Sequence, residues 1–245
     1  VKDFGGVTEQ AADKALAVSP SSSIRNIADR YTEKRGLKVE HNRTPLTVDP
    51  DRGSAIARAY DEMPHAPNDP DVQKAYSALI AEVLDQWRDI KASGLTVSKI
   101  KPDMKNPYKN SSDLIKDVRD NNHMWYYPTE SGFGTTVTND IHPLLRNSGE
   151  LINGEPVPVN DIFRIVHDYF GHVKEGLSFG PKGEENAWLQ HMQMLSPEAQ
   201  KALTTETRGQ NSWVNLGPKA AQNRANPANT IYAEQKAGIL PDWTR

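Results

Sequence analysis

The sequence predicts an α+β fold that is mainly helical, with helices around a small β-sheet and a metal site at the end of a central helix. Three observations predict this fold. Before residue 94, apolar residues recur at three- and four-residue intervals, as they do on amphipathic helices. From Leu95 to Gly149, short runs of β-branched and aromatic residues replace that pattern. After residue 159, a helical pattern carries two histidines and an acidic residue.

Composition narrows the class of protein. A chain of 245 residues with 36% hydrophobic and 25% charged residues is typical of a globular protein, and we expect an N-terminal arm over 1–20 and one globular domain over 21–245. The net charge of −3 argues against an obligate nucleic-acid binder, because phosphate contacts need an excess of Lys and Arg. The absence of cysteine excludes disulfides, iron–sulfur clusters and thiolate zinc sites.

Membrane association is not expected. No apolar run approaches the roughly 20 residues of a membrane span, and the first 20 residues lack a signal-peptide core. We therefore expect a soluble, cytoplasmic protein.

Three helices in the first part of the chain are expected to form a scaffold. Each begins with residues that favour a helix N-terminus, serines in the first and an Asp-Pro pair in the other two. Each also has one apolar face that can pack on the core. The expected ranges are 21–34, 50–63 and 70–93.

The middle of the chain is expected to supply the strands. Val97 and Ile100 indicate one strand, and the aromatic run from His123 to Tyr127 indicates another, with a short helix over 111–119 between them. Ile152-Asn153-Gly154-Glu155 is typical of a hairpin turn, which would lie just before the central helix.

That central helix is predicted for Asn160 to His172, NDIFRIVHDYFGH. Asn160 and Asp161 suit the N-cap and first turn, and the apolar spacing places His167 towards the interior, where it needs a polar partner. On an unbroken helix, at about 100° per residue, His172 would lie about 140° away from His167. We expect Gly171 to adopt a left-handed conformation that ends the helix and returns His172 beside His167.

Two neutral imidazoles facing one point form two-thirds of a 2-His-1-carboxylate iron site, or of a catalytic zinc site with an open position. The simpler alternative is that His167 is a hydrogen-bonded core histidine and His172 a loop residue.

The segment HDYFGHV, preceded by NDI, resembles the metal-binding signature of the pterin-dependent aromatic amino acid hydroxylases. In that family an Asp-Ile pair leads into His-Glu-x-x-Gly-His-Val, and both histidines bind iron; Asp168 stands here in place of the glutamate. The resemblance implies that His167 and His172 are iron ligands, and that the third ligand is a glutamate on the second helix after the pair, a place that Glu206 occupies. The chain is also similar to uncharacterised proteins of tailed-phage genomes, which implies the host cytoplasm as its location.

The next helical segment, GEENAWLQHMQML, offers other ligands. Glu184 and His191 share one face and Glu185 lies on the neighbouring stripe, so all three are substitutes for Glu206, and together these groups could hold two metals. Asp168 could orient a ligand imidazole or a bound water. The simpler interpretation of Glu184 and Glu185 is that of acids favoured by the helix dipole.

A polar cluster, TTETRGQNSW, follows at the end of the next helix, which Ser196-Pro197 begins. Its substrate-binding candidates are Arg208, Gln210, Asn211 and Trp213. The Arg208 guanidinium can clamp a carboxylate or phosphate through two parallel hydrogen bonds. The alternative is a solvated helix end capped by Gly209. The tail from Gly217 to Arg245 is expected to wrap the surface.

Three functions fit these residues. The first is a non-haem Fe(II) oxygenase or hydroxylase acting on a small polar or aromatic substrate. The second is a zinc-dependent hydrolase with the same ligands, in which Glu184 or Glu185 is the general base. The third is a phage structural protein with a stabilising metal. The HExxH spacing of zinc proteases is absent, which favours iron over zinc. A small-molecule substrate is the partner that the first two functions require.

Overall fold

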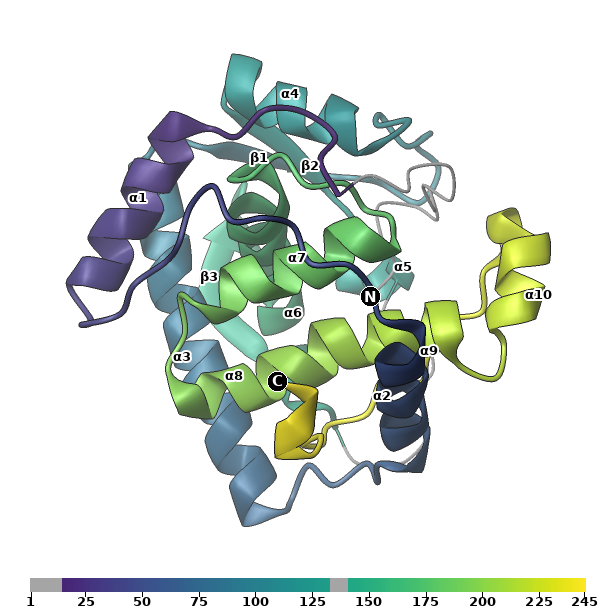
Figure 1. The fold of residues 1–245 in the computed structure, drawn as a ribbon. Coiled ribbons are helices and arrows are strands. Elements are labelled where there is room, and N and C mark those ends of the chain that lie inside the picture. Colours follow the sequence, from purple (N-terminus) through teal and green to yellow (C-terminus); the bar gives the residue numbers. More distant parts are fainter. Residues whose placement is uncertain (1–14, 133–140) are drawn as a thin grey trace.

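The computed structural model describes residues 15–132 and 141–245. Its fold is mainly helical α+β, as the sequence predicts, and its strands form two small sheets where one was expected (Figure 1). The helices are α1 Ser22–Glu33, α2 Pro50–Glu62, α3 Pro70–Ala92, α4 Ser111–Asn121, α5 Thr129–Gly132, α6 Val159–His167, α7 Pro181–Met192, α8 Pro197–Thr204, α9 Gln210–Leu216 and α10 Ala220–Ala225. The strands are β1 Thr96–Lys99, β2 His123–Tyr126, β3 Asn147–Ile152 and β4 Glu155–Pro158. Two π-helical segments are η3 Asp168–Val173 and η4 Thr205–Gly209, and the 3₁₀ turns are η2 Pro143–Leu145, η5 Pro227–Asn229 and η6 Asp242–Thr244.

The three scaffold helices begin where the sequence predicts. The Ser21 hydroxyl accepts from the amide of Ile24, and the carboxylates of Asp49 and Asp69 each accept from two amides in the first turn of their helices. The interior helix α6 lies behind α7 and packs against α3, while α10 projects from the body (Figure 1). Within the described ranges, no helix combines the length and the apolar character needed to cross a bilayer.

The strands form two separate pairs. β1 and β2 are parallel, with Thr96 opposite His123, and the connection between them contains α4. β3 and β4 form the predicted hairpin, whose turn places Asn153 and Gly154 at φ of 53° and 83°. This left-handed pair is the conformation for which Asn-Gly is favoured, so the turn is explained by its sequence.

The central helix differs from the prediction at both ends. α6 begins at Val159, and the Asp161 carboxylate accepts from the amide of Thr129, at 2.7 Å, and from its hydroxyl instead of capping the helix. Gly171 does not have a positive φ, and the helix continues through η3 to Val173. Gly209 likewise does not cap a helix end, because η4 continues directly into α9.

Both ends of the chain are more tightly packed than expected. Residues 15–20 of the predicted arm lie along 174–178, where the amide of Ala17 donates to the carbonyl of Gly176 at 2.7 Å. Residues 1–14 lie outside the described residues. The tail does not simply wrap the surface, since Ala237 and Leu240 are buried and Tyr60 donates to the Glu234 carbonyl at 2.6 Å. This segment completes the core around α2.

Candidate metal centre

His167 and His172 are brought together by the π-helical segment. A π turn closes hydrogen bonds from i to i+5, so residues five apart lie nearly above one another. The amide of Lys174 donates to the carbonyl of Tyr169, five residues earlier, at 3.0 Å. The two histidine rings are consequently perpendicular neighbours with centroids 5.3 Å apart. The sequence predicts the meeting of the rings, but its mechanism is a wider helical turn and not a helix end.

The close approach of α7 explains the glycine in this turn. A Cβ on Gly171 would lie 3.2 Å from the carbonyl oxygen of Ala187 and 3.2 Å from Cε1 of His167. Contacts this short require the neighbours to move. Gly171 therefore allows α7 to lie directly against the two histidines.

The His167 ring is held in one tautomer by a chain of hydrogen bonds. The Gln86 amide nitrogen lies 3.4 Å from the carbonyl of Met194, so its Oε1 faces Nε2 of His191 at 2.8 Å and accepts its hydrogen. Nδ1 of His191 then carries a lone pair and accepts from Nδ1 of His167, 3.1 Å away. The remaining nitrogen, Nε2 of His167, must present a lone pair.

That lone pair is buried and has no hydrogen-bond partner within the described residues. His167 is 5% exposed, and burial, together with the nearby His172 and His191, holds its pKa well below the usual range. The imidazole is therefore neutral, which is the form that binds a metal ion. A buried acceptor without a donor costs about 1–3 kcal/mol, which an ion at this position would offset.

His172 presents its Nε2 to the same point. Its Nδ1 lies 3.3 Å from the carbonyl of Leu177, which can only accept, so Nδ1 carries the hydrogen. Its Nε2 lies 3.4 Å from Oε2 of Glu184, in the first turn of α7. A positive charge next to both atoms, such as a metal ion, would favour this arrangement of a lone pair and a carboxylate oxygen.

Glu184 completes a group of three. One ligand atom from each of His167, His172 and Glu184 lies within 4.8 Å of the others, and among the described residues no other group of His, Asp or Glu meets this criterion. Bonds of about 2.1 Å place two ligand atoms on one ion at most about 4.2 Å apart. Three atoms around one ion lie closer than this, at most about 3.6 Å from one another, so the side chains would have to draw together by up to about 1 Å to bind it.

Among the described residues, Glu184 rather than Glu206 lies beside the histidine pair. The Glu206 carboxylate is buried and accepts from the hydroxyl of Tyr76 at 2.5 Å, from Nε2 of His142 at 3.1 Å and from the amide of Gln210 at 3.1 Å. Tyr76, which donates to Glu206, and Gln86, which accepts from His191, both lie on α3. They are ten residues apart, which is about 15 Å along the helix axis. Glu206 therefore belongs to a second polar network and not to the histidine pair.

Glu185 is engaged by an arginine. Arg208 binds both of its carboxylate oxygens, with Nε 3.1 Å from Oε2, and also donates to the carbonyl of Thr244 at 2.5 Å. The guanidinium lies 4.1 Å above the ring of Trp188. Both charged groups are nearly buried, so Arg208 is committed to an internal ion pair and is not available as the expected clamp for a substrate anion.

The other expected site residues are divided between several places. Gln210 pairs with Glu206 and Gln235, and the Trp213 indole donates to Asp61 at 2.9 Å. His191 orients His167 instead of facing the ion. Asp168 is buried on η3. It lies near Tyr108, whose pKa is raised mainly by burial and in part by the charge of Asp168.

Arg208, Glu185 and Asn211 do line one cavity, of about 150 Å³, beside the first turn of α7. It lies between that turn, α9 and the segment 46–56. Because Arg208 is neutralised by Glu185, it does not by itself make the cavity an anion site; Asp49 and Arg52 also line it.

The residues that orient the histidines are not among those predicted from the sequence. Gln86 is fully buried on the apolar face of α3, between Val83 and Ile90. A polar residue on an apolar helical face is the signal that could have identified it. The role of the Leu177 carbonyl cannot be predicted from the sequence, because every residue has a main-chain carbonyl.

Comparisons of the chain with protein-family models, with curated proteins and with solved structures find no match. Support for a function therefore comes from the chemistry of the site itself.

Proposed function

We propose that this chain is a mononuclear metal enzyme whose ion is bound by His167, His172 and Glu184. The observation that carries the proposal is the convergence of two oriented imidazole nitrogens and one carboxylate within 4.8 Å. Both histidines are held by their Nδ1 atoms in the tautomer that ligation requires. Such support is typical of ligand histidines and has less purpose in a histidine that only fills a core.

We further propose that the ion is Fe(II) and the reaction an oxidation of a small polar or aromatic substrate. Two histidines and one carboxylate on one side of an ion are the ligand set of non-haem iron oxygenases, and this set leaves positions for dioxygen and substrate. The resemblance of HDYFGHV to the hydroxylase signature supports the same choice.

The zinc hydrolase alternative is less well supported by the geometry. It requires a carboxylate base beside the ion, for which Glu184 and Glu185 were the candidates. Glu184 is assigned as a ligand here, and Glu185 is bound through both oxygens by Arg208. With both committed, a zinc-bound water has neither of them as its base.

The protein's own groups have separate tasks in the proposed reaction. The ion supplies the redox chemistry. Gln86 and His191 keep the lone pair of His167 directed at it, and the carbonyl of Leu177 does the same for His172. Phe163 stacks on His167 with ring centroids 6.1 Å apart, and Phe179 meets His172 edge-on with centroids 4.6 Å apart, so both rings exclude water from that side.

Metal analysis tests the ligand assignment. Apo-protein would be titrated anaerobically with Fe(II) and separately with Zn(II), and bound metal measured by elemental analysis. We expect one equivalent in the wild type and loss of at least about tenfold in affinity in His167→Ala, His172→Ala and Glu184→Gln. Glu206→Gln is the matched control, because it also neutralises a buried carboxylate, and it should keep the ion.

The type of reaction is tested by nitric oxide added to the Fe(II) protein. An iron–nitrosyl signal in electron paramagnetic resonance would show a position open to a dioxygen-like ligand. An ion that binds tightly but gives no such signal would indicate a structural metal, as in the phage structural alternative. Full occupancy in Glu184→Gln together with loss in Glu206→Gln would return the third position to Glu206.

A further inference from the structure

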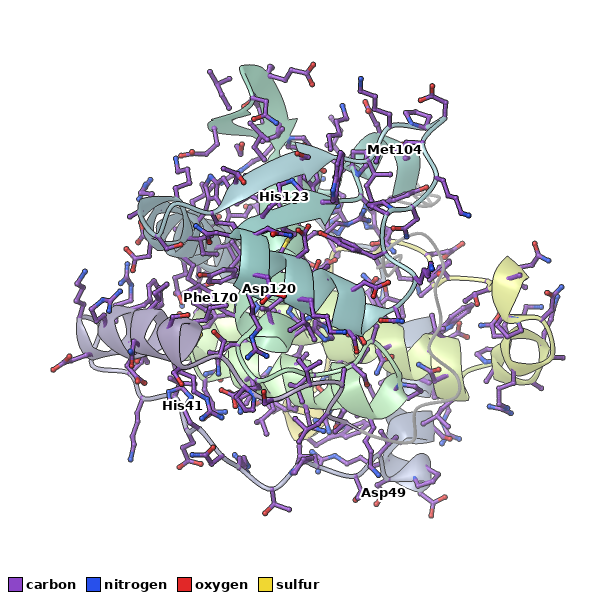
Figure 2. The ribbon with its side chains drawn as sticks, turned by 90° about the horizontal axis from the view of Figure 1, so that it is seen from above. His41, Asp49, Met104, Asp120, His123 and Phe170 are labelled. Atoms are coloured by element: carbon purple, nitrogen blue, oxygen red, sulfur yellow. The ribbon has the colours of Figure 1, made fainter. Side chains whose placement is uncertain are left out.

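A second group of reactive side chains lies on the outer face of the parallel strand pair, away from the proposed metal centre. Thr96 is opposite His123 and Ser98 is opposite Trp125, so these four side chains share one face. Val97, Met124 and Tyr126 point the other way into the core. Figure 2 shows His123 on this strand pair, next to α4, the helix that carries Asp120 near its end.

Ser98, His123 and Asp117 form a continuous hydrogen-bonded line on this face. Oγ of Ser98 lies 2.9 Å from Nε2 of His123, and Nδ1 of His123 lies 2.8 Å from Oδ2 of Asp117. An ionised carboxylate can only accept, so Nδ1 carries the hydrogen and Nε2 has the lone pair. The hydroxyl of Ser98 therefore donates to His123, which is the proton order of a serine nucleophile with its base and orienting acid.

The carboxylate is held in place and kept ionised. Although burial acts to raise its pKa, hydrogen bonds from Tyr108, Asn121 and His123 lower the pKa of Asp117 overall. Tyr108 donates to Oδ2 at 2.6 Å and itself accepts from the amide of Trp125 at 2.8 Å, so its hydroxyl has only one direction in which to donate. Asn122, with φ of 49°, turns the chain from α4 directly into β2 and fixes the separation of Asp117 and His123.

Two other serines of the protein make a different hydrogen bond. Ser93 and Ser148 each donate to a backbone carbonyl at 2.6 Å, as serines commonly do. Ser98 instead faces an imidazole, and it is only partly buried. The side chains of His123 and Asp117 are 21% and 17% exposed, so both partners of the partly buried Ser98 also lie within reach of solvent.

We propose that Ser98, His123 and Asp117 are an acyl-transfer site for small aryl esters, separate from the metal centre. Ser98 is the nucleophile, His123 the general base and acid, and Asp117 the positioning residue. The ring of Trp125, with its centroid 5.4 Å from that of His123, provides a flat apolar surface for the aryl group.

The reaction has two balanced steps. First, Oγ of Ser98 bonds to the ester carbonyl carbon while its proton passes to Nε2 of His123. The carbon–oxygen bond to the aryl group breaks, and the aryl oxygen takes that proton to leave as a phenol. Then water adds to the acyl carbon and gives a proton to Nε2. The bond to Ser98 breaks and Oγ regains the proton, so ester and water become acid and phenol.

A fluorophosphonate probe tests the nucleophile without turnover. Oγ of Ser98 bonds to phosphorus, the phosphorus–fluorine bond breaks, and fluoride leaves with the proton relayed by His123. We expect one adduct per chain, located on Ser98 by peptide mass spectrometry. Labelling should be absent in Ser98→Ala and at least about tenfold slower in His123→Gln. Ser148→Ala, a serine on another strand, is the matched control and should label normally.

Two further measurements separate this site from a structural network and from the metal centre. Asp117→Glu should label faster than Asp117→Asn, with matching circular dichroism, because only the first keeps the carboxylate. Hydrolysis of p-nitrophenyl acetate should persist in Glu184→Gln with a chelator present and disappear in Ser98→Ala. An adduct on any other residue, or equal labelling rates in wild type and His123→Gln, would overturn the proposal and leave the proposed metal function untouched.

Discussion

His167 and His191 face one another through their Nδ1 atoms, 3.1 Å apart, although they come from different helices. Two imidazoles can share such a contact only if one nitrogen carries a hydrogen and the other does not. Gln86 decides which, because its amide is oriented by the carbonyl of Met194 and its oxygen faces Nε2 of His191. The main-chain carbonyl of Met194 thus fixes the direction of the His167 lone pair through Gln86 and His191.

Replacing Gln86 by leucine should weaken metal binding while leaving all three ligands in place. Without the acceptor oxygen, His191 is free to carry its hydrogen on Nδ1, and His167 then loses the partner that holds its tautomer. Loss of such a supporting group costs about 10–100-fold in affinity. Competition titration with a chromogenic chelator measures the change.

The matched control is Gln200→Leu. The Gln200 amide also donates to main-chain carbonyls, those of Met192 and Leu195, at 3.2 and 3.0 Å, but these bonds do not involve a histidine. Equal metal affinities for the two variants would contradict the role assigned to Gln86.

Gly171→Ala should lower metal affinity, since the new methyl group meets the ring of His167 and the carbonyl of Ala187, both at 3.2 Å. Either the ring or α7 must move, and Glu184 is carried on α7. Gly209→Ala, in the other π-helical segment, is the control. Its methyl group meets Leu240 at 2.7 Å, so it should lower the melting temperature without lowering metal affinity. Isothermal titration and thermal melts measure both; unchanged affinity in Gly171→Ala would count against the close packing of α7 on the site.

Much of the helical scaffold can be predicted from the sequence, because helix caps and tight turns are determined by neighbouring residues. Ser21, Asp49 and Asp69 cap helices at the predicted positions, and Asn153-Gly154 forms the predicted turn. These features depend only on neighbouring residues.

The π-helical segments were not predictable in the same way. A helix with Gly171 near its end is as consistent with termination as with a wider turn, and only the packing of α7 decides between them. The identity of the third ligand that we propose depends on the same packing. Glu184, Glu185 and Glu206 are equivalent as carboxylates in sequence, but His172, Arg208 and Tyr76 respectively engage them in the fold.

The Glu206 network should affect stability and not metal binding. Burial raises the pKa of Tyr76 well above its usual value, so its hydroxyl stays protonated and donates to Glu206. Tyr76→Phe removes this donor from a buried carboxylate, and we expect a loss of about 1–3 kcal/mol in the free energy of unfolding. Urea denaturation measures the loss, and iron stoichiometry should stay at the wild-type value. A fall in stoichiometry would connect Glu206 to the ion after all.

Variants of the ion pair between Glu185 and Arg208 can distinguish a structural role of Arg208 from a role in substrate binding. Arg208→Ala leaves the Glu185 carboxylate nearly buried with its two strongest hydrogen bonds removed, and it also removes the guanidinium from the face of Trp188. Breaking a buried pair in this way costs about 3–5 kcal/mol. For a domain of this size the melting temperature should fall by about 6–20 °C.

The double variant Glu185→Gln/Arg208→Met distinguishes this explanation from a role in substrate binding. It removes both charges while keeping most of the buried volume, so no unpaired charge remains, and its melting temperature should lie above that of Arg208→Ala. Metal affinity should be close to wild type, because Glu184 points away from the pair towards His172. If Arg208→Ala instead keeps the wild-type melting temperature and loses only oxidation activity, Arg208 acts on the substrate in the cavity that it lines with Asn211.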